Sequence, residues 1–275
     1  MSEAKKLPPE DFRKLQLLEL DCLIELDRVC RKNNIPYVIY CGTLLGAVRH
    51  RGFIPWDDDL DVAMLREDYE RFRLIADQLN PKICFLQDHR LDPNYLWGHS
   101  KLRRTGTIFV RAGQEHLKYK TGVCIDVFPL DDLPENPLIF RLKKFHCYCL
   151  RKIFWSRVAV FDKKKNWFWK LWWKCVSKFP IELAENMLLS YALESRNDSP
   201  NEVAVLTGAG SVSWVGMPKE WFRDRVEYEF EGRKFFGPRD YHGLLTLKYG
   251  ENYMQPPPDK EITQHPVSIY KFDVD

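Results

Sequence analysis

Four aspartates fall within five positions of this 275-residue chain: Asp57, Asp58, Asp59 and Asp61. Carboxylates this close repel one another and cannot all stay ionised without a counter-charge. Divalent cations such as Mg²⁺ bind carboxylate oxygens and often share substrate phosphates with them. An acidic loop that caps a helix is the plainer alternative. The spacing therefore predicts a metal site for a phosphorylated substrate, provided that other residues supply the missing partners.

The segment that begins at Asp59 alternates acidic and apolar residues and then becomes apolar, a pattern typical of a strand. Residues i and i+2 of a strand share a face, so we expect Asp59 and Asp61 to lie side by side. Asp57 would stand at the strand entrance and could join them. Asp58 would face the other way, and we expect it to be the least essential of the four.

A further carboxylate, Asp126, interrupts an apolar strand predicted over residues 122–130. A lone carboxylate among apolar neighbours is costly to bury unless a cation meets it. We therefore expect Asp126 to be the third ligand, contributed by a neighbouring strand. Asp131 and Asp132 are expected to be turn or cap residues.

A short strand over residues 37–41 ends at Gly42 and Thr43, and a helical segment then runs to about His50. Thr43 is a typical N-cap residue. A helix N-terminus offers free N–H groups and the positive end of the helix dipole, which together suit a phosphate. Many tight turns share this pattern, so it gains its weight from the aspartates that follow.

Lys101, Arg103 and Arg104 form a compact cationic group in the first of two paired strands, expected over residues 96–103 and 107–110. Lys101 and Arg103 share one strand face. A solvated sheet edge would explain them equally well in isolation. Beside an acidic site that needs a phosphate, they favour phosphate binding instead.

The remaining pattern predicts an α+β fold in one domain over residues 1–275, with a helical insert at about 134–200. No internal repeat or low-complexity linker divides the chain. The first helix should act only as packing scaffold. The predicted helices cover residues 10–33, 66–79 and 241–249, and a hairpin covers residues 226–236.

The insert contains a strongly basic and aromatic segment, residues 141–178. It holds twelve Lys or Arg residues against one acid, Asp162, and five tryptophans are interleaved with them. Such helices can pack their rings on the core and leave the lysine ammonium groups in water. They can also lie on an anionic membrane surface. Binding of single-stranded nucleic acid is a third alternative, and we do not expect it.

The overall composition is ordinary for a globular protein, with 45% hydrophobic residues, 29% charged residues and a net charge of +3. None of the eight cysteines forms a C-x-x-C pair, and the spacing around His146, Cys147 and Cys149 suits no familiar zinc site. We expect reduced thiols in a cytoplasmic protein, free or peripheral at the inner face of the membrane. We see no signal peptide and no apolar run of the roughly 18 residues that a membrane span requires.

These segments resemble the LicD family of phosphocholine transferases, which belongs to the nucleotidyltransferase superfamily. The resemblance rests on residues 40–50, 52–61, 101–103 and 122–131, and late segments near residues 230–254 also look like the family. It implies a mixed β-sheet flanked by helices. It further implies that Gly42 and Thr43 contact the nucleotide phosphates and that Asp59, Asp61 and Asp126 hold a metal ion, with Asp57 as ligand of a second ion.

The resemblance also implies the reaction. Family members transfer phosphocholine, or a related phospho-alcohol, from CDP-choline or another CDP-alcohol to a hydroxyl of a cell-surface glycan. Teichoic acid and lipopolysaccharide are such acceptors, lipid-linked or free. We expect Mg²⁺ or Mn²⁺ as cofactor.

We expect Asp126 to accept the proton of the acceptor hydroxyl. Arg49, Lys101 and Arg103 should bind phosphate oxygens. His265, in a tail that follows three prolines, should contact the donor or the acceptor. Two alternatives remain: a nucleotidyltransferase that transfers NMP from an NTP, and a membrane-surface binding module without activity.

Overall fold

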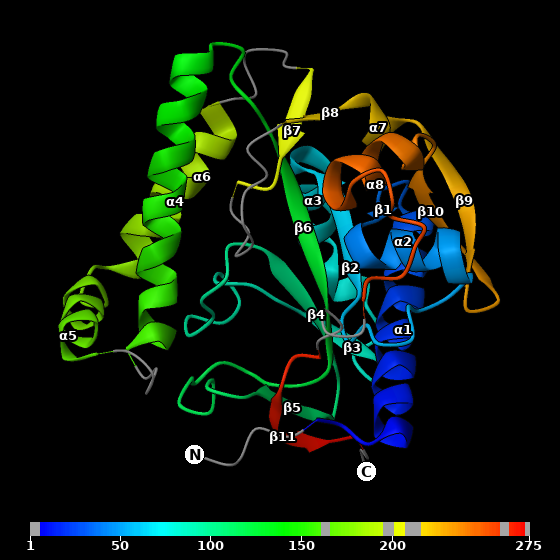
Figure 1. Cartoon of the computed structure of the whole chain (residues 1–275), viewed down its shortest axis with the longest axis horizontal. Coiled ribbons are helices and arrows are strands. Elements are labelled where there is room, and N and C mark those ends of the chain that lie inside the picture. Colours follow the sequence, from blue (N-terminus) through cyan, green and yellow to red (C-terminus); the bar gives the residue numbers. More distant parts are fainter. Residues whose placement is uncertain (1–5, 161–165, 195–200, 207–215, 259–263, 273–275) are drawn as a thin grey trace.

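The computed structural model describes residues 6–160, 166–194, 201–206, 216–258 and 264–272. Its centre is a mixed sheet flanked by helices, which confirms the predicted α+β class (Figure 1). The pair β2–β6 is parallel and the other pairs are antiparallel. In spatial order the strands are β1 (Val38–Ile39), β2 (Asp61–Leu65), β6 (Cys124–Asp132), β4 (Ser100–Arg104) and β3 (Cys84–Gln87), and β7 (Glu202–Ala204) and β8 (Met217–Pro218) continue the sheet from the far end of β6.

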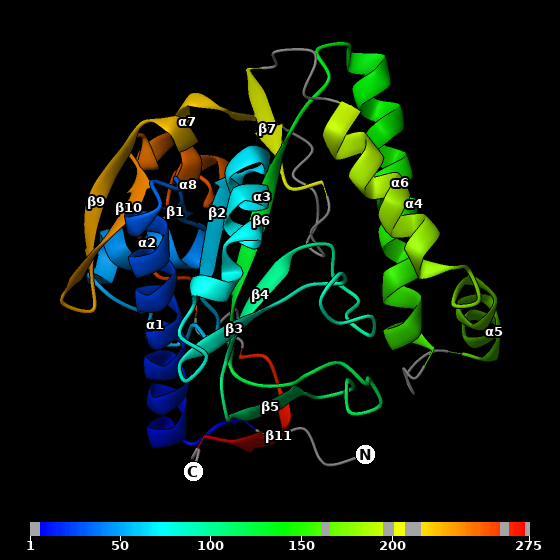
Figure 2. The ribbon, with the colours of Figure 1, turned by 180° about the vertical axis from the view of Figure 1, so that it is seen from behind.

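One face of this sheet is covered by helices α1 (Pro9–Lys32) and α3 (Arg66–Leu74) (Figure 2). The Tyr69 hydroxyl of α3 lies 2.6 Å from the Ser100 hydroxyl of β4. Side chains alternate along a strand, so the neighbouring Lys101 points to the opposite face. That opposite face is left for the candidate site.

The predicted helices are largely confirmed. Helix α1 ends where the Asn33–Asn34 pair begins, and α2 (Cys41–His50) follows β1. The predicted helix 66–79 is divided into α3 and a short 3₁₀ helix, η1 (Ala76–Gln78). Helix α8 (Tyr241–Tyr249) ends at Gly250, whose φ is +83°.

Small strand pairs lie beside the main sheet. The predicted hairpin is confirmed as β9 (Arg225–Phe230) and β10 (Arg233–Pro238), and the short helix α7 (Glu220–Arg223) precedes it. The predicted pairing of β4 with β5 (Ile108–Arg111) is wrong, because β3 and β6 occupy both edges of β4. Strand β5 instead pairs with β11 (Val267–Lys271), a segment that we expected to be an irregular tail.

The predicted insert forms three helices: α4 (Pro137–Ala159), α5 (Trp167–Val176) and α6 (Ile181–Glu194). We call them the helical arm. Helices α4 and α6 pack on each other around a separate hydrophobic core, and the single-domain interpretation stays a prediction. The core residues of the arm and its junction are Leu133, Cys147, Leu150, Phe154, Ala184, Leu188, Ala204 and Leu206. The basic residues 163–165 lie outside the described ranges.

All eight cysteines are free thiols, and Cys147 belongs to the core of the arm. Cys149, by contrast, is exposed. Among the helices in the described ranges, none is both long and apolar enough to cross a membrane.

Candidate active site

The register of the sheet places charged side chains in one row across three strands. Asp61 of β2 is the partner of Asp126 of β6, which is in turn the partner of Lys101 of β4. Register partners on neighbouring strands project to the same face. The prediction that Asp126 lies on a strand adjacent to Asp61 is therefore confirmed. Asp59 precedes Asp61 by two residues and lines the same cavity as Asp126 and Lys101.

Acids in this row and in the segment just before β2 repel one another, and this raises the pKa values of Asp57, Asp59 and Asp61. Burial, followed by the charge of Asp59, raises the pKa of Asp57 to about 8. Burial and the charges of Asp59 and Asp126 raise the pKa of Asp61 well above its usual range. The pKa of Asp59 is also raised, by burial and then by Asp126. A set of partly buried carboxylates that raise one another's pKa is a donor set suited to a hard divalent cation.

Gly42 allows helix α2 to approach these acids. A Cβ at this position would lie 2.4 Å from Oδ2 of Asp57, well inside van der Waals contact. Any larger residue would push the carboxylate away from the helix N-terminus. The cluster and the Gly42 turn therefore fit each other, as expected if both serve one ligand.

Thr43 does not cap helix α2, contrary to our expectation. The helix begins at Cys41 with Tyr40 as N-cap, and the Thr43 N–H donates to the Tyr40 carbonyl at 3.1 Å. The buried Thr43 hydroxyl instead accepts from the Asp61 N–H at 2.8 Å. Thr43 thereby holds the start of β2, while a contact of Gly42 or Thr43 with phosphate stays a prediction.

Asp126 is the exception among the acids. Burial alone would raise its pKa, but Lys101 and then His99 outweigh this effect and hold the pKa well below its usual range. Lys101 forms an ion pair with Asp126, and His99 Nε2 lies 3.6 Å from Asp126 Oδ2. Sequence reasoning missed the buried His99, although it precedes Lys101 by two residues and continues the same alternation.

The predicted cations take different positions. Arg103 is buried, and it donates to Gln87 Oε1 and to the Gly122 carbonyl, each at 2.7 Å. Lys101 and Arg103 line one cavity, which confirms their shared strand face. Arg104 points elsewhere and forms an ion pair with Asp21. Arg49 donates to the Tyr253 carbonyl at 2.9 Å and does not line this cavity.

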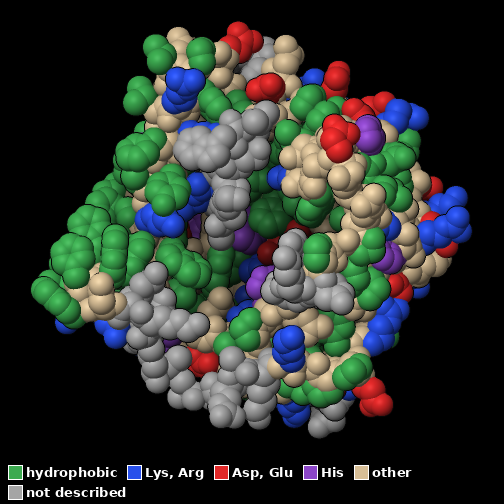
Figure 3. Space-filling view, in the orientation of Figure 1, with side chains coloured by type: hydrophobic (Ala, Val, Ile, Leu, Met, Phe, Trp, Pro, Cys, Tyr) green, Lys and Arg blue, Asp and Glu red, His purple; other side chains and the backbone are tan. Residues whose placement is uncertain are grey.

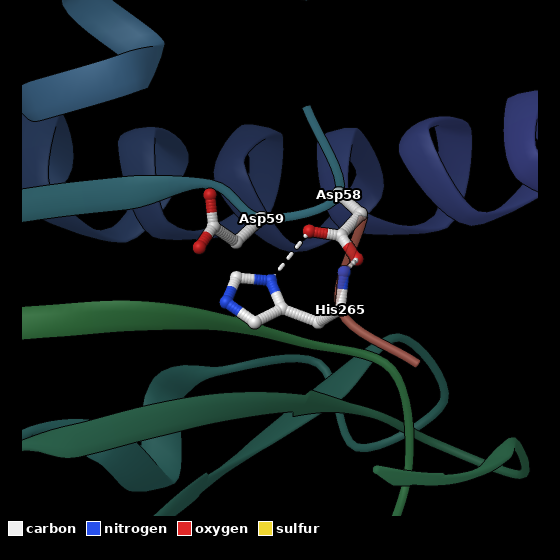
Figure 4. A group of neighbouring side chains, drawn as sticks. All are labelled: Asp58, Asp59 and His265. Atoms are coloured by element: carbon white, nitrogen blue, oxygen red, sulfur yellow. Dashed lines mark hydrogen bonds and ion pairs between the residues drawn. The ribbon is translucent and has the colours of Figure 1, made fainter. Parts of the chain in front are cut away.

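Asp58 is tethered to the C-terminal segment (Figure 4). Its Oδ1 lies 2.8 Å from His265 Nδ1, its Oδ2 accepts from the His265 N–H at 2.9 Å, and Arg111 Nη1 lies 2.5 Å from Oδ2. Burial would raise its pKa, but His265 and Arg111 reverse this and lower it. Asp58, Asp59 and His265 lie close enough to share a metal ion, yet Arg111 and His265 already neutralise Asp58. A tether is therefore the better interpretation of Asp58.

A cavity of about 290 Å³ lies on the open face of the sheet. A hollow near the centre of Figure 3 shows acidic, basic and histidine side chains together. Of the residues predicted from sequence, Asp59, Lys101, Arg103, Asp126 and His265 line the cavity. Its other lining residues include Glu19, Trp97, Phe109, Arg111, Gln114, Tyr119 and Cys124.

We expected α1 to be packing scaffold only, and this expectation is wrong, because Glu19 of α1 lines the cavity. Glu19 is 2% exposed, and burial followed by the charge of Asp59 raises its pKa well above the usual range. Its position was visible in the sequence as an acid on the apolar face of the helix, four residues after Leu15 and three before Cys22. Gln16, one turn earlier, donates to the Asp57 carbonyl at 3.0 Å.

The segment that carries these strands matches a known protein family. Residues 34–139 match the LicD/FKTN/FKRP nucleotidyltransferase domain. The chain is 29% identical to the lipopolysaccharide cholinephosphotransferase LicD of Haemophilus influenzae over 269 residues, which cover 92% of this chain and 95% of that protein.

Two uncharacterized proteins match a shorter part of the chain. The protein from Rickettsia typhi is 42% identical over 77 residues, or 28% of this chain and 24% of its own length. The protein from Rickettsia prowazekii is 42% identical over 76 residues, or 28% of each chain. The matched domain includes β2, β4 and β6 and the acidic row that they carry, and the chain is similar to a LicD protein along nearly its whole length.

Proposed function

We propose that this protein is a phosphotransferase that moves phosphocholine from a CDP-activated donor to a hydroxyl of a glycan, of the kind found in lipopolysaccharide. The similarity to a lipopolysaccharide cholinephosphotransferase supports the class of reaction. The observation that carries the proposal is the row Asp61–Asp126–Lys101, of which Asp126 and Lys101 line one cavity together with Asp59. Phosphoryl transfer requires such a combination, because it depends mainly on positioning and charge stabilisation.

The donor set fits Mg²⁺ or Mn²⁺. Asp57, Asp59, Asp61 and Asp126 would hold one or two ions, since they are hard oxygen ligands whose mutual repulsion a divalent cation would relieve. When bound, the ion would neutralise charge on the transferred phosphoryl group and on the leaving phosphate.

The side chains around the ion site have distinct tasks in this proposal. Thr43 holds the backbone at Asp61, and Lys101 orients the Asp126 carboxylate. Lys101, Arg103 and Arg111 bring positive charge to the cavity, where donor phosphates would bind.

Asp126 faces the cavity in its ionised form, where it can orient an acceptor hydroxyl. Lys101 and His99 lower its pKa, and a weak base removes a proton less readily. The ion pair therefore favours cation binding and orientation over the proton abstraction that we expected of Asp126.

A donor panel tests the proposal. The full chain is incubated with CDP-choline, other CDP-alcohols or NTPs, with Mg²⁺ or Mn²⁺ and a glycan extract, and the products are identified by mass. We expect the acceptor to gain phosphocholine and CMP to be released. A gain of NMP with release of pyrophosphate would instead show a nucleotidyltransferase.

Matched variants tie the activity to the site. Asp59→Asn should abolish transfer, whereas Asp77→Asn, at an exposed aspartate of η1, should not change it. Full activity of Asp59→Asn across the donor panel would refute the proposed metal site.

A further inference from the structure

The outer face of helix α5 is apolar and lies in water. No residue of this ten-residue helix is buried. Trp167 is 75% exposed, Phe168 is 56% exposed and Trp172 is 53% exposed. Rings of this size usually fill a core or an interface. Three of them exposed on one short helix therefore indicate a surface that binds a membrane or another protein.

The spacing in α5 separates its apolar and basic side chains. Trp167 and Leu171 are four residues apart and share one side of the helix, as do Phe168 and Trp172. Lys170 and Lys174 form a third pair of this kind, next to Trp167 and Leu171 around the helix. With Trp169, which is 47% exposed, the apolar side chains cover most of the helix surface and the lysines occupy one side, an arrangement typical of a helix that lies in a membrane interface.

Helix α4 extends the apolar surface. Leu138, Leu142 and Phe145 recur at helical spacing and are 68%, 71% and 63% exposed. In Figures 1 and 2, α5 lies beside one end of α4, at the outer edge of the molecule and away from the main sheet. In Figure 3 hydrophobic side chains gather along this flank, with lysine and arginine among them.

The charge of this flank has a single sign. Helices α4 and α5 together contain eight Lys or Arg residues, of which only Lys144 is buried, and no Asp or Glu. Anionic lipid headgroups attract such segments, whereas a neutral apolar partner would gain nothing from the lysines. A second copy of this flank would bring like charges together, which disfavours self-association.

We propose that the outer flank of α4 and α5 docks on an anionic phospholipid surface, with the α5 rings among the headgroups. At 1.5 Å per residue α5 is about 15 Å long, half the thickness of a hydrocarbon core, so it lies in the surface. Tryptophan prefers this interfacial depth. Docking would bring the cavity of the main sheet close to acceptors held at a membrane.

Vesicle flotation of the full chain tests the inference. We expect the protein to float with phosphatidylcholine vesicles that contain phosphatidylglycerol, to float much less with phosphatidylcholine alone, and to lose binding in high salt. Lys170→Glu combined with Lys174→Glu should weaken binding about tenfold or more. Trp167→Ser combined with Phe168→Ser and Trp172→Ser should weaken it at least as much.

Matched controls carry the same changes away from the flank. Lys82→Glu with Lys234→Glu changes the net charge equally, and Leu74→Ser with Leu91→Ser removes exposed apolar side chains from elsewhere. Neither control should alter flotation. Thermal denaturation should show every variant folded, because each of the substituted side chains is exposed.

Three results would overturn the inference. The first is a wild-type protein that binds neither kind of vesicle, and the second is a control pair that weakens binding as much as the α5 variants. The third is a set of α5 variants that change only the oligomeric state in sedimentation velocity, which would show a protein interface instead. Because the readout is binding, none of these results depends on the proposed catalytic activity.

Discussion

Strand β6 carries aspartates at both ends, and the two ends are built differently. Asp126 is paired with Lys101, and its charge helps to raise the pKa values of the neighbouring Asp59 and Asp61. Asp131, five residues later, is fully buried and accepts two hydrogen bonds from Arg66, at 2.6 and 3.1 Å. The next residue, Asp132, forms an ion pair with Lys219 at 2.6 Å.

The parallel pairing of β2 with β6 positions the charged residues at both ends of β6. Strands β2 and β6 are parallel, so the register that puts Asp61 beside Asp126 also puts Leu65 beside Leu130. Arg66, the first residue of α3, then falls beside Asp131. The far end of β6 holds acids that have internal cations and stabilise the fold, whereas Asp57, Asp59 and Asp61 repel one another and await an external cation.

The largest expected effect is at the acidic row. Asp61→Asn should lower the transfer rate about a thousandfold, because a metal ligand contributes several kcal/mol to charge stabilisation. Its free energy of unfolding should stay the same or rise, since one repelling charge is removed. Activity assays and urea denaturation measure the two effects.

The distinction between the two ends of β6 would be wrong if Asp61→Asn lowered the free energy of unfolding as much as Asp131→Asn does. Asp77→Asn is the control, since it removes the same charge from an exposed site outside the row.

The opposite end should respond through stability. Asp131→Asn leaves the Arg66 guanidinium buried without its main counter-charge, which should lower the free energy of unfolding by about 3–5 kcal/mol. The folded fraction should keep its transfer rate. Urea denaturation followed by circular dichroism measures the loss.

The double variant Arg66→Met with Asp131→Leu should recover most of that stability, because it removes both charges together. A double variant as unstable as Asp131→Asn would assign the cost to packing and not to the lost counter-charge.

The free energy of unfolding of the metal-free protein should depend on pH through the acids near the start of β2. Asp57, Asp59 and Asp61 have raised pKa values, so the folded state binds more protons than the unfolded state between about pH 4 and pH 8. The stability contributed by these groups therefore falls as pH rises through this window. Thermal denaturation in EDTA should show the fall, and Asp57→Asn should reduce it.

Mg²⁺ should reverse this fall. At a hundredfold excess over Kd, the ion should add about 3 kcal/mol, with the larger gain near pH 8 where the acids are ionised. An increase in Tm that is equal at pH 5 and pH 8 would contradict a carboxylate site.

The smallest effect is expected at Asp132. Its ion pair with Lys219 is only partly buried, so Asp132→Asn should cost about 0.2–1 kcal/mol and leave activity unchanged. Urea denaturation should be measured for both Asp132→Asn and Asp131→Asn. The two losses in free energy of unfolding then compare adjacent acids that differ in burial. Equal losses would show that burial does not set the difference between them.

Local patterns predicted much of this molecule. The alternation after Asp59, the lone acid in the apolar strand of Asp126 and the shared face of Lys101 and Arg103 each depend on a period of two residues. The helices and the β9–β10 hairpin likewise follow from short-range periodicity and turn residues. The residues expected to hold a cation were therefore visible before the strands were paired.

Pairings between distant segments were decided only by the tertiary structure. Arg66 and Asp131 are 65 residues apart, and Asp58 and His265 are 207 residues apart. A period along the chain reports which face a side chain shares, but not which strand lies next to that face. We therefore expected Asp131 to be a turn or cap residue and His265 to lie in a C-terminal tail, although both are held by buried charges.

By itself, the sequence determined which residue types gather on each strand face: acids in the β2 segment, one acid in the β6 segment and cations in the β4 segment. The tertiary structure decided which charges meet. The parallel register of β2 and β6 sets Asp61 against Asp126 and Arg66 against Asp131. That register is a property of packing, because it depends on how the apolar faces of distant strands fit the core beneath them.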